Sequence, residues 1–288
     1  MTYKIITDSS CDIDFDFEKN HKINLIPMKS YIGEDIYEIG PCDEESLRKF
    51  YEKMDQGFSP STSQINENDY EKAFEKILKE GYDIIYLGLT ASLSGSFNNA
   101  QRAREVLKKA YKDRRIELID PFQASTGLGL IIESLEEMKD EGKSFDEIID
   151  FVDKNAKHLV THFAVENLKY LYHGGRISKN KAMVGDFLKV KPILHIKDDG
   201  SLDILKLERG SKKALKNLYK NFKKNYRPDI SNKVLIGYAY TDENAKKLAE
   251  LIKKDYEDID LRLAPIGSII GSHVGPGMYS ISYFADKR

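Results

Sequence analysis

Along the first half of the chain, short apolar runs alternate with amphipathic segments, which is typical of β–α–β units and of a largely parallel sheet. The run 83–89 is almost wholly apolar, as expected for a strand that is covered on both faces. A helix is predicted to begin after Asp43, which stands in the N-cap position. Its apolar face, at helical spacing, consists of Leu47, Phe50, Tyr51 and Met54. Further strands are predicted at 3–7, 24–28 and 116–119, and further helices from about 66 to 81, after 94–96, from 126 to about 139, and from 144.

The second half of the chain has a different pattern. A hairpin is predicted where the runs 191–197 and 202–207 flank Asp198-Asp199-Gly200-Ser201, because such a turn favours antiparallel pairing. Other strands are predicted at 159–165, 234–240, 261–266 and 279–284, and helices at 211–226 and 244–254. At 288 residues the chain is also long for a single hydrophobic core. We therefore predict an α/β protein of two closely packed domains: residues 1–155 with a mostly parallel sheet flanked by helices, and residues 156–288 with a mixed sheet that contains antiparallel pairs.

Composition narrows the range of functions. Hydrophobic residues make up 41% of the chain and charged residues 32%, which is typical of a folded globular protein. The net charge of −2 argues against nucleic acid as a partner, since phosphate binding needs a basic surface. No apolar run approaches the roughly 20 residues that cross a bilayer, so stable membrane insertion is not expected. The N-terminus has no secretory signal pattern, and the two cysteines, Cys11 and Cys42, suit a reducing compartment, so a cytoplasmic location is predicted.

Four polar or glycine-rich segments could carry chemistry, because ligands of open α/β sheets bind at the carboxyl ends of the strands. They are 59–64, 90–96, 174–178 and 267–277. The first two contain more hydroxyl groups than helix capping needs, whereas a bound anion would use hydroxyls and backbone amides together. Neutral hydroxyls suit a carboxylate better than a phosphate, for which a nearby lysine or arginine is expected. Helix capping remains the alternative for these two segments, and a tight turn with an exposed arginine is the alternative for the third.

The fourth segment, 267–277, is the most specific of them. We interpret it as a glycine-rich loop in which the backbone can approach a ligand closely, with His273 between the glycines. Several other signatures are missing from the sequence, including the phosphate loop Gly-x-x-x-x-Gly-Lys-Ser/Thr, the Gly-x-Ser-x-Gly elbow around Ser94, and any zinc-ligand spacing. No resident cofactor and no metal are therefore predicted.

Taken in order, the segments resemble the DegV family, which includes the carrier subunits of fatty acid kinase that are often called FakB. The resemblance runs through most of the chain, in seven blocks: 6–12, 61–64, 93–97, 124–129, 174–177, 191–194 and 270–277. It implies two α/β domains with a long-chain fatty acid held between or within them. Two departures stand out: Ser96, where the family often has threonine, and Tyr172-His173, where a lysine-rich version is commoner. The second departure affects the surface that would meet a partner.

The same resemblance implies roles for individual residues. The carboxylate-binding hydroxyls of the family match Thr62 and Ser94, and Ser63 and Gly95 adjoin them. The positions that the family uses in phosphoryl transfer match Arg209 and His273, with Arg176 as a further candidate. The chain would then not be an enzyme by itself. It would bind the fatty acid and present the carboxylate to a separate ATP-binding fatty acid kinase protein, which forms the acyl phosphate.

Two other functions remain open from the sequence. One is a serine hydrolase or esterase that uses Ser94 with His273, although no acidic residue that would orient the histidine is evident. The other is a sensor or transport module for a different small apolar acid. The length of the acyl chain, its saturation and the oligomeric state do not follow from the sequence.

Overall fold

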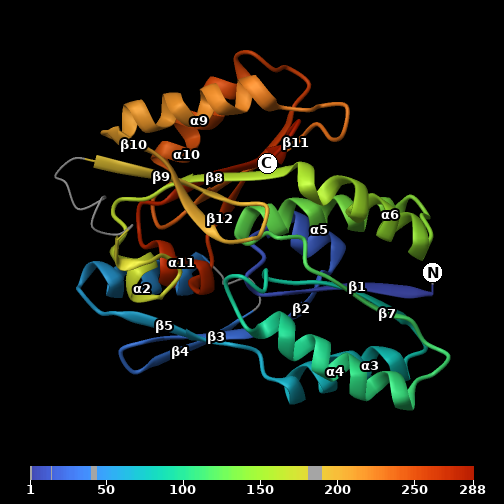
Figure 1. The fold of residues 1–288 in the computed structure, drawn as a ribbon. Coiled ribbons are helices and arrows are strands. Elements are labelled where there is room, and N and C mark those ends of the chain that lie inside the picture. The colour runs from blue at the N-terminus through green and yellow to red at the C-terminus, as the bar shows by residue number, and fades with distance from the viewer. Residues whose placement is uncertain (1, 14, 40–43, 181–189) are drawn as a thin grey trace.

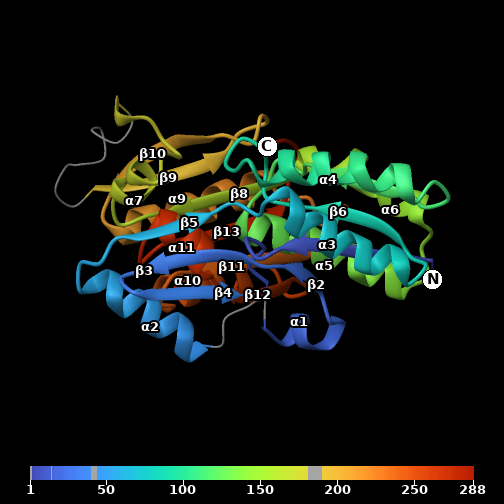
Figure 2. The ribbon, with the colours of Figure 1, turned by 90° about the horizontal axis from the view of Figure 1, so that it is seen from below.

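A computed structural model gives the structure of residues 2–13, 15–39, 44–180 and 190–288. Its helices and sheets are stacked in layers (Figure 1). A four-stranded sheet and a six-stranded sheet have helices between them, and further helices cover the outer face of each sheet. A three-stranded sheet lies beside these layers (Figure 2). This is the α/β architecture that the alternating pattern predicts.

The four-stranded sheet, called here the parallel sheet, has the order β2-β1-β6-β7, and all its strand pairs are parallel. Its strands are β1 (Tyr3–Asp8), β2 (Asn24–Ile26), β6 (Asp83–Leu87) and β7 (Ile116–Ile119). One face is covered by α3 (Glu67–Lys79) and α4 (Ser96–Ala110), and the other by α1 (Phe15–His21), α5 (Ser125–Asp140) and α6 (Phe145–Asn155). The side chains of β6 after Asp83 are all buried, which confirms a strand covered on both faces.

The six-stranded sheet, called here the mixed sheet, has the order β10-β9-β8-β13-β11-β12. Its strands are β8 (Leu159–Ala164), β9 (Val190–Ile196), β10 (Leu202–Arg209), β11 (Lys233–Tyr238), β12 (Asp260–Pro265) and β13 (Tyr279–Phe284). Among the described strands of this sheet, the pair β11–β12 alone is parallel, and β9–β10 is the predicted antiparallel hairpin. A short 3-10 turn (Ala156–His158) precedes β8, and α9 (Ser211–Asn225) and α10 (Glu243–Lys253) cover the outer face.

The three-stranded sheet, called here the small sheet, was not predicted. It consists of β3 (Met28–Ile32), β4 (Asp35–Ile39) and β5 (Pro60–Ser63), in the antiparallel order β4-β3-β5. The prediction of one strand at 24–28 is wrong, because β2 and β3 belong to different sheets and Pro27, which has no amide proton, separates them. The segment 59–64 forms β5 rather than a helix cap. Helix α2 (Glu44–Asp55) buries the predicted apolar face, whereas its predicted cap, Asp43, lies outside the described residues.

Helix α5 lies between the two large sheets, and this position explains its composition. All its side chains from Ser125 to Glu136 are buried, as expected of a helix that is packed on every side. A Cβ atom at Gly129 would lie 2.2 Å from the backbone oxygen of Asp12, so only glycine allows this close approach. The buried Glu133 is paired with Arg262 of β12 at 2.6 Å. Within the described residues, no helix is long and apolar enough to cross a membrane.

The hydrophobic core continues across the predicted domain boundary. Helix α6 ends at Asn155 and β8 begins at Leu159, so the boundary falls between elements. One hydrophobic cluster nevertheless contains side chains from both sides of it, among them Ile6, Tyr86, Phe163 and Ile196. The division into 1–155 and 156–288 therefore stays a prediction.

At the end of β1, the buried carboxylate of Asp8 organises the loop that follows β6. Its Oδ2 accepts hydrogen bonds from the hydroxyl of Tyr86 and the backbone amide of Leu89, both at 2.9 Å. The hydroxyl of Tyr70 lies 2.7 Å from that of Tyr86. Because Tyr86 donates its single proton to Asp8, Tyr70 must donate to Tyr86. These bonds hold the start of the loop that carries Ser94.

The substitution Tyr86→Phe is expected to lower the free energy of unfolding by about 1–3 kcal/mol. It removes one donor from the buried Asp8 and leaves the hydroxyl of Tyr70 without its acceptor. Urea unfolding followed by circular dichroism measures the change. The control is Tyr82→Phe, at a partly exposed tyrosine, for which a change within about 0.5 kcal/mol is expected. Equal effects of the two substitutions would contradict the importance of this buried network.

Candidate functional site

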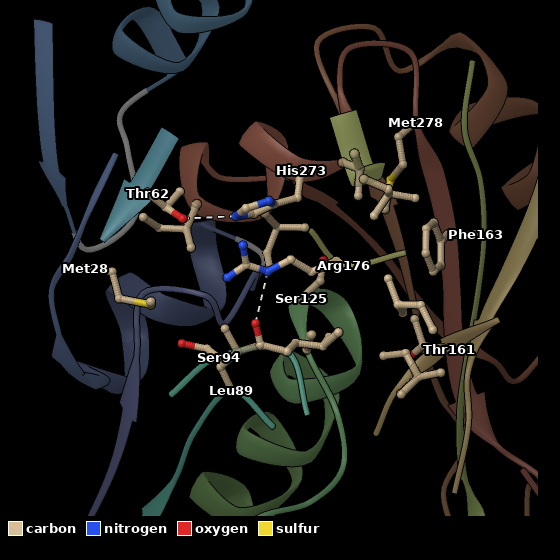
Figure 3. A pocket seen from close by; sticks show the side chains of 18 of the residues that line it. Met28, Thr62, Leu89, Ser94, Ser125, Thr161, Phe163, Arg176, His273 and Met278 are labelled. Atoms are coloured by element: carbon tan, nitrogen blue, oxygen red, sulfur yellow. Dashed lines mark hydrogen bonds between the residues drawn. The ribbon is translucent and has the colours of Figure 1, made fainter. Parts of the chain in front are cut away.

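A pocket of about 250 Å³ lies where the small sheet, the mixed sheet and the loops after the parallel strands meet (Figure 3). Its lining is largely apolar. The apolar residues of the lining are Met28, Leu89, Leu93, Ala124, Phe163, Leu171, Ile196, Leu202, Ile269, Ile270, Val274 and Met278. The polar side chains of the lining are Thr62, Ser63, Gln64, Ser94, Ser125, Thr161, Arg176 and His273. The pocket thus combines apolar walls with a few polar groups, as small-molecule sites commonly do.

The polar end of the pocket is formed by Thr62, Ser94, Arg176 and His273. Thr62 is on β5, and His273 is on α11 (Ser268–Val274). The Oγ1 atom of Thr62 lies 3.0 Å from Nε2 of His273 (Figure 3). Ser94 is buried, and its Oγ lies 3.0 Å from Oγ of Ser96 and accepts the Ser96 backbone amide at 3.2 Å.

His273 lies on a short helix, so the prediction of a glycine-rich loop at this position is wrong. Gly271 allows α11 to pack closely, because a Cβ atom there would lie 2.4 Å from the hydroxyl oxygen of Tyr51. Burial, and then the charge of Arg176, lower the pKa of His273 to about 4. The imidazole is therefore neutral at neutral pH. Its Nδ1 has no hydrogen-bond partner among the described residues.

Arg176 connects two of the predicted segments. It follows α7 (Lys169–His173) and the double glycine, and its Nε donates to the backbone oxygen of Leu93 at 3.0 Å. Nη1 also donates to the backbone oxygen of Gly174. Burial lowers the pKa of this partly buried guanidinium. The tight turn of the alternative is present at Gly174 and Gly175, but its exposed arginine is wrong, because Arg176 is partly buried and forms part of the wall beside Ser94.

The other predicted residues have different positions. Ser63 lines the pocket next to Thr62. Gly95 is the N-cap residue of α4, and a Cβ atom there would lie 2.6 Å from Oε1 of Gln64. Arg209 is the last residue of β10, is exposed and does not line the pocket. The structure therefore does not bring Arg209 together with His273 in the pocket.

The sequence did not point to two further hydroxyls of the lining, Ser125 and Thr161. Ser125 Oγ donates to Oδ2 of Asp12 at 2.6 Å, and Thr161 Oγ1 donates to Oε1 of Gln123 at 2.9 Å. A hydroxyl has one proton, so neither group can donate to a ligand while these bonds persist. The sequence did contain a signal for Ser125, because this residue lies in 124–129, one of the seven blocks that carry the resemblance to the DegV family.

The hydroxyls at the polar end differ in this respect. The partner of Thr62 is an imidazole nitrogen of His273, and that of Ser94 is the hydroxyl of Ser96. Each of these partners can act as donor or acceptor, so the protons of Thr62 and Ser94 can turn toward a ligand. The pocket therefore has one end that can donate hydrogen bonds to an anion. No group of three or more His, Cys, Asp and Glu that could hold a metal ion is found in the part of the chain that the structure describes.

The fold and the pocket define an α/β protein with a mostly apolar internal site that has one hydrogen-bonding end. The sequence profile of the DegV family, described as uncharacterised proteins, matches residues 2–286. The chain belongs to the DegV family, which confirms the resemblance seen in the sequence.

Relatives of known sequence or structure resemble the chain over its whole length. A DegV domain-containing protein of Clostridium perfringens is 35% identical over 99% of this chain and 98% of its own. A Thermotoga maritima protein named as a fatty acid-binding protein is 31% identical, with 100% of both chains covered. A solved structure described as a DegV lipid-binding protein, also from Thermotoga maritima, has a TM-score of 0.84 at 28% identity and covers 100% of both chains. These similarities confirm the predicted mixed α/β fold.

Proposed function

We propose that this chain binds a long-chain fatty acid in the pocket, with the carboxylate at the hydroxyls of Thr62 and Ser94. Ser63 and the backbone at Gly95 complete this end, and the apolar walls take the acyl tail. The observation that carries the proposal is the asymmetry of the pocket, in which one end can donate hydrogen bonds and the other hydroxyls of the lining are already committed. The relative named as a fatty acid-binding protein supports the same ligand class.

Simple energetics support this ligand class. Burial of a C16 chain at about 0.8 kcal/mol per methylene supplies on the order of 11 kcal/mol of gross driving force. Ordering and association costs remove a large part of it. A buried carboxylate without partners costs several kcal/mol, so the donors at the polar end are needed for binding. The neutral state of His273 also allows its Nε2 to carry a proton toward the carboxylate without adding a buried charge.

We further propose that a separate ATP-dependent kinase phosphorylates the bound fatty acid. A carboxylate oxygen would attack the γ-phosphorus of ATP, the bond to ADP would break, and the acyl phosphate would stay bound. The sequence has no phosphate loop of its own, which favours a nucleotide held by another protein. His273 at the polar end, the nearby Arg176 and the exposed Arg209 would stabilise the negative charge as the two anions approach.

No specific observation favours the hydrolase alternative. The hydrogen bonds pair His273 with Thr62 and Ser94 with Ser96, rather than Ser94 with His273. The Nδ1 atom of His273, where a triad would place its orienting acid, has no hydrogen-bond partner among the described residues. Fatty acid binding is therefore the function that the geometry supports best.

Extraction of the purified protein under denaturing conditions, followed by mass spectrometry, tests the proposal. About one fatty acid per chain is expected, and its length and saturation would identify the preferred tail. If the protein is empty and also fails to take up added laurate or palmitate, the proposal is wrong. Release of a different small apolar acid would favour a sensor or transport function instead.

A further inference from the structure

The buried carboxylate of Asp12 joins three segments that are far apart in the sequence. Asp12 lies after β1 and is 4% exposed. Its Oδ2 accepts the hydroxyl proton of Ser125, at the start of α5, at 2.6 Å. Its Oδ1 accepts the backbone amide of Gly267, the N-cap residue of α11, at 2.8 Å. One carboxylate thus receives two donors from two elements that both form walls of the pocket.

Ser125, one of the two residues that Asp12 holds, has a backbone conformation that needs support. Ser125 has a φ of +55°, in the left-handed region that is uncommon for residues other than glycine. Its backbone is held from the Asp12 segment, since its amide donates to Ser10 at 3.0 Å and its carbonyl accepts the Asp12 amide at 3.4 Å. Backbone strain of this kind persists where surrounding bonds determine it, and such sites are often functional.

Helix α11 is the second element that depends on Asp12. The helix carries Ile269, Ile270, Val274 and His273 into the pocket. It is also held by a hydrogen bond from Ser30 to Ser268 at 2.7 Å, so the helix keeps a second anchor if the contact at Gly267 is lost. We expect a shift at its start to change the 3.0 Å distance between Thr62 and His273, which lies near its other end.

We propose that Asp12 is a positioning residue of the fatty acid site and acts in its ionised form. By accepting hydrogen bonds from Gly267 and Ser125 together, it sets α11, and with it His273, against Thr62. The proposal rests on the fatty acid function proposed above, since ligand binding is its readout. It extends that function, because Asp12 does not itself touch the pocket.

The ionised form is needed because both partners are donors. A protonated carboxyl group can give its proton to the Ser125 hydroxyl, but the amide of Gly267 then meets a neutral acceptor in place of a charged one. Charge-assisted hydrogen bonds are about twice as strong as neutral ones, so protonation is expected to weaken binding by about fivefold.

The charge of Asp12 changes within the range of ordinary solution conditions. Burial raises its pKa to about 7, against the lowering effect of the bonds from Ser125 and Gly267. Among the charged or titratable groups on the described elements packed near it are Asp8 and Cys11 beside it, Glu133 of α5 with Arg262 of β12, and His273 of α11. The pKa of Cys11 is raised well above its ordinary value, and that of His273 is lowered to about 4. Between about pH 6 and pH 8, Cys11 and His273 therefore keep their charge states while Asp12 ionises.

Stability and binding should respond to this ionisation in opposite directions. The pKa of Asp12 is higher in the folded protein than its ordinary value of 3.8, so the folded state holds a proton that the unfolded state has already lost. Folding stability therefore falls as the pH rises from about 4 to about 7. Asp12→Asn, which has a similar shape and no charge, should raise the melting temperature at pH 8. If Asp12 served stability alone, Asp12→Asn would instead lower the melting temperature at pH 8.

The test measures laurate binding by titration calorimetry, and melting temperature, between about pH 6 and pH 8. The wild type is expected to bind about fivefold more tightly at the higher pH. Asp12→Asn should bind at the low-pH level of the wild type throughout and melt higher at pH 8. Ser125→Ala removes a hydrogen bond that lowers the pKa of Asp12. The midpoint of its profile of laurate affinity against pH should therefore lie at a higher pH than that of the wild type. The control Asp113→Asn, at an exposed aspartate, should leave both profiles unchanged.

The outcomes separate the two proposals. If the wild type does not bind laurate or palmitate at any pH, the fatty acid function fails. If the wild type binds but Asp12→Asn keeps the same pH profile, or binds more tightly, Asp12 does not position the site. Tighter wild-type binding at low pH would also overturn the inference, because it would mean that the charge of Asp12 repels the bound carboxylate.

Discussion

Replacing Thr62 and Ser94 together by alanine is expected to weaken fatty acid binding about a hundredfold. Each hydroxyl can donate one hydrogen bond to the carboxylate, and a bond to a charged group contributes about 1.5–3 kcal/mol. At the lower of these values, loss of both bonds would cost about 3 kcal/mol. This corresponds to about a hundredfold in affinity, because a factor of ten in affinity corresponds to about 1.4 kcal/mol. Titration calorimetry with laurate measures the change. An affinity equal to that of the wild type would show that Thr62 and Ser94 do not bind the carboxylate.

A matched control is available in the same two segments. Ser61 lies on β5 beside Thr62, and Ser92 lies in the same loop as Ser94, but both are exposed and neither lines the pocket. The double substitution Ser61→Ala with Ser92→Ala should leave laurate affinity within about twofold of the wild type. Thermal unfolding of both double variants would establish that a loss of binding does not reflect a loss of fold.

Substitution of Arg209 by alanine should lower acyl phosphate formation by about a hundredfold or more while fatty acid binding stays intact. Arg209 is exposed and lies outside the pocket, so its removal leaves the site unchanged. Removing a group that stabilises transition-state charge commonly costs about 10²–10³ in rate. The measurement is product formation with ATP and the fatty acid kinase protein of the same organism. Lys206→Ala, at another exposed cation of β10, serves as the control.

His273→Ala is the companion to this experiment and has a different structural basis. His273 touches Thr62 directly, so its removal acts at the polar end of the pocket itself. We expect the variant to retain the lipid, because Thr62 and Ser94 keep their protons, but to lose product formation. Full activity of either the Arg209 or the His273 variant would show that the residue has no part in phosphoryl transfer.

Local patterns were sufficient for most of the secondary structure. The hairpin of β9 and β10 and the buried strand β6 follow from turn chemistry and apolar runs, which act over a few residues. The small sheet could not be predicted in the same way. Its strand β5 has the polar sequence Pro60–Ser63, and it forms because backbone pairing with β3 outweighs a composition that suggests a cap.

Several of the candidate site residues lie together in the structure. Thr62, Ser63, Ser94, Arg176 and His273 do line one pocket, and the hydroxyl density of two segments was the signal for the first three. The helical conformation of α11 was missed, because its glycines suggest a loop. Gly271 is instead required by the close approach of Tyr51, a contact that no local pattern contains.

By itself, the sequence determined which chemical groups are present, in which order, and on which kinds of element, because helical and strand periodicity are local properties. Only the tertiary structure decided which of these groups share a site. Thr62 and His273 are 211 residues apart in the sequence and 3.0 Å apart in space. It also decided which hydroxyl protons a ligand can use, since Ser125 and Thr161 give theirs to acceptors 113 and 38 residues away. Each hydroxyl can donate only one hydrogen bond, and which acceptor receives it depends on the packing between distant segments.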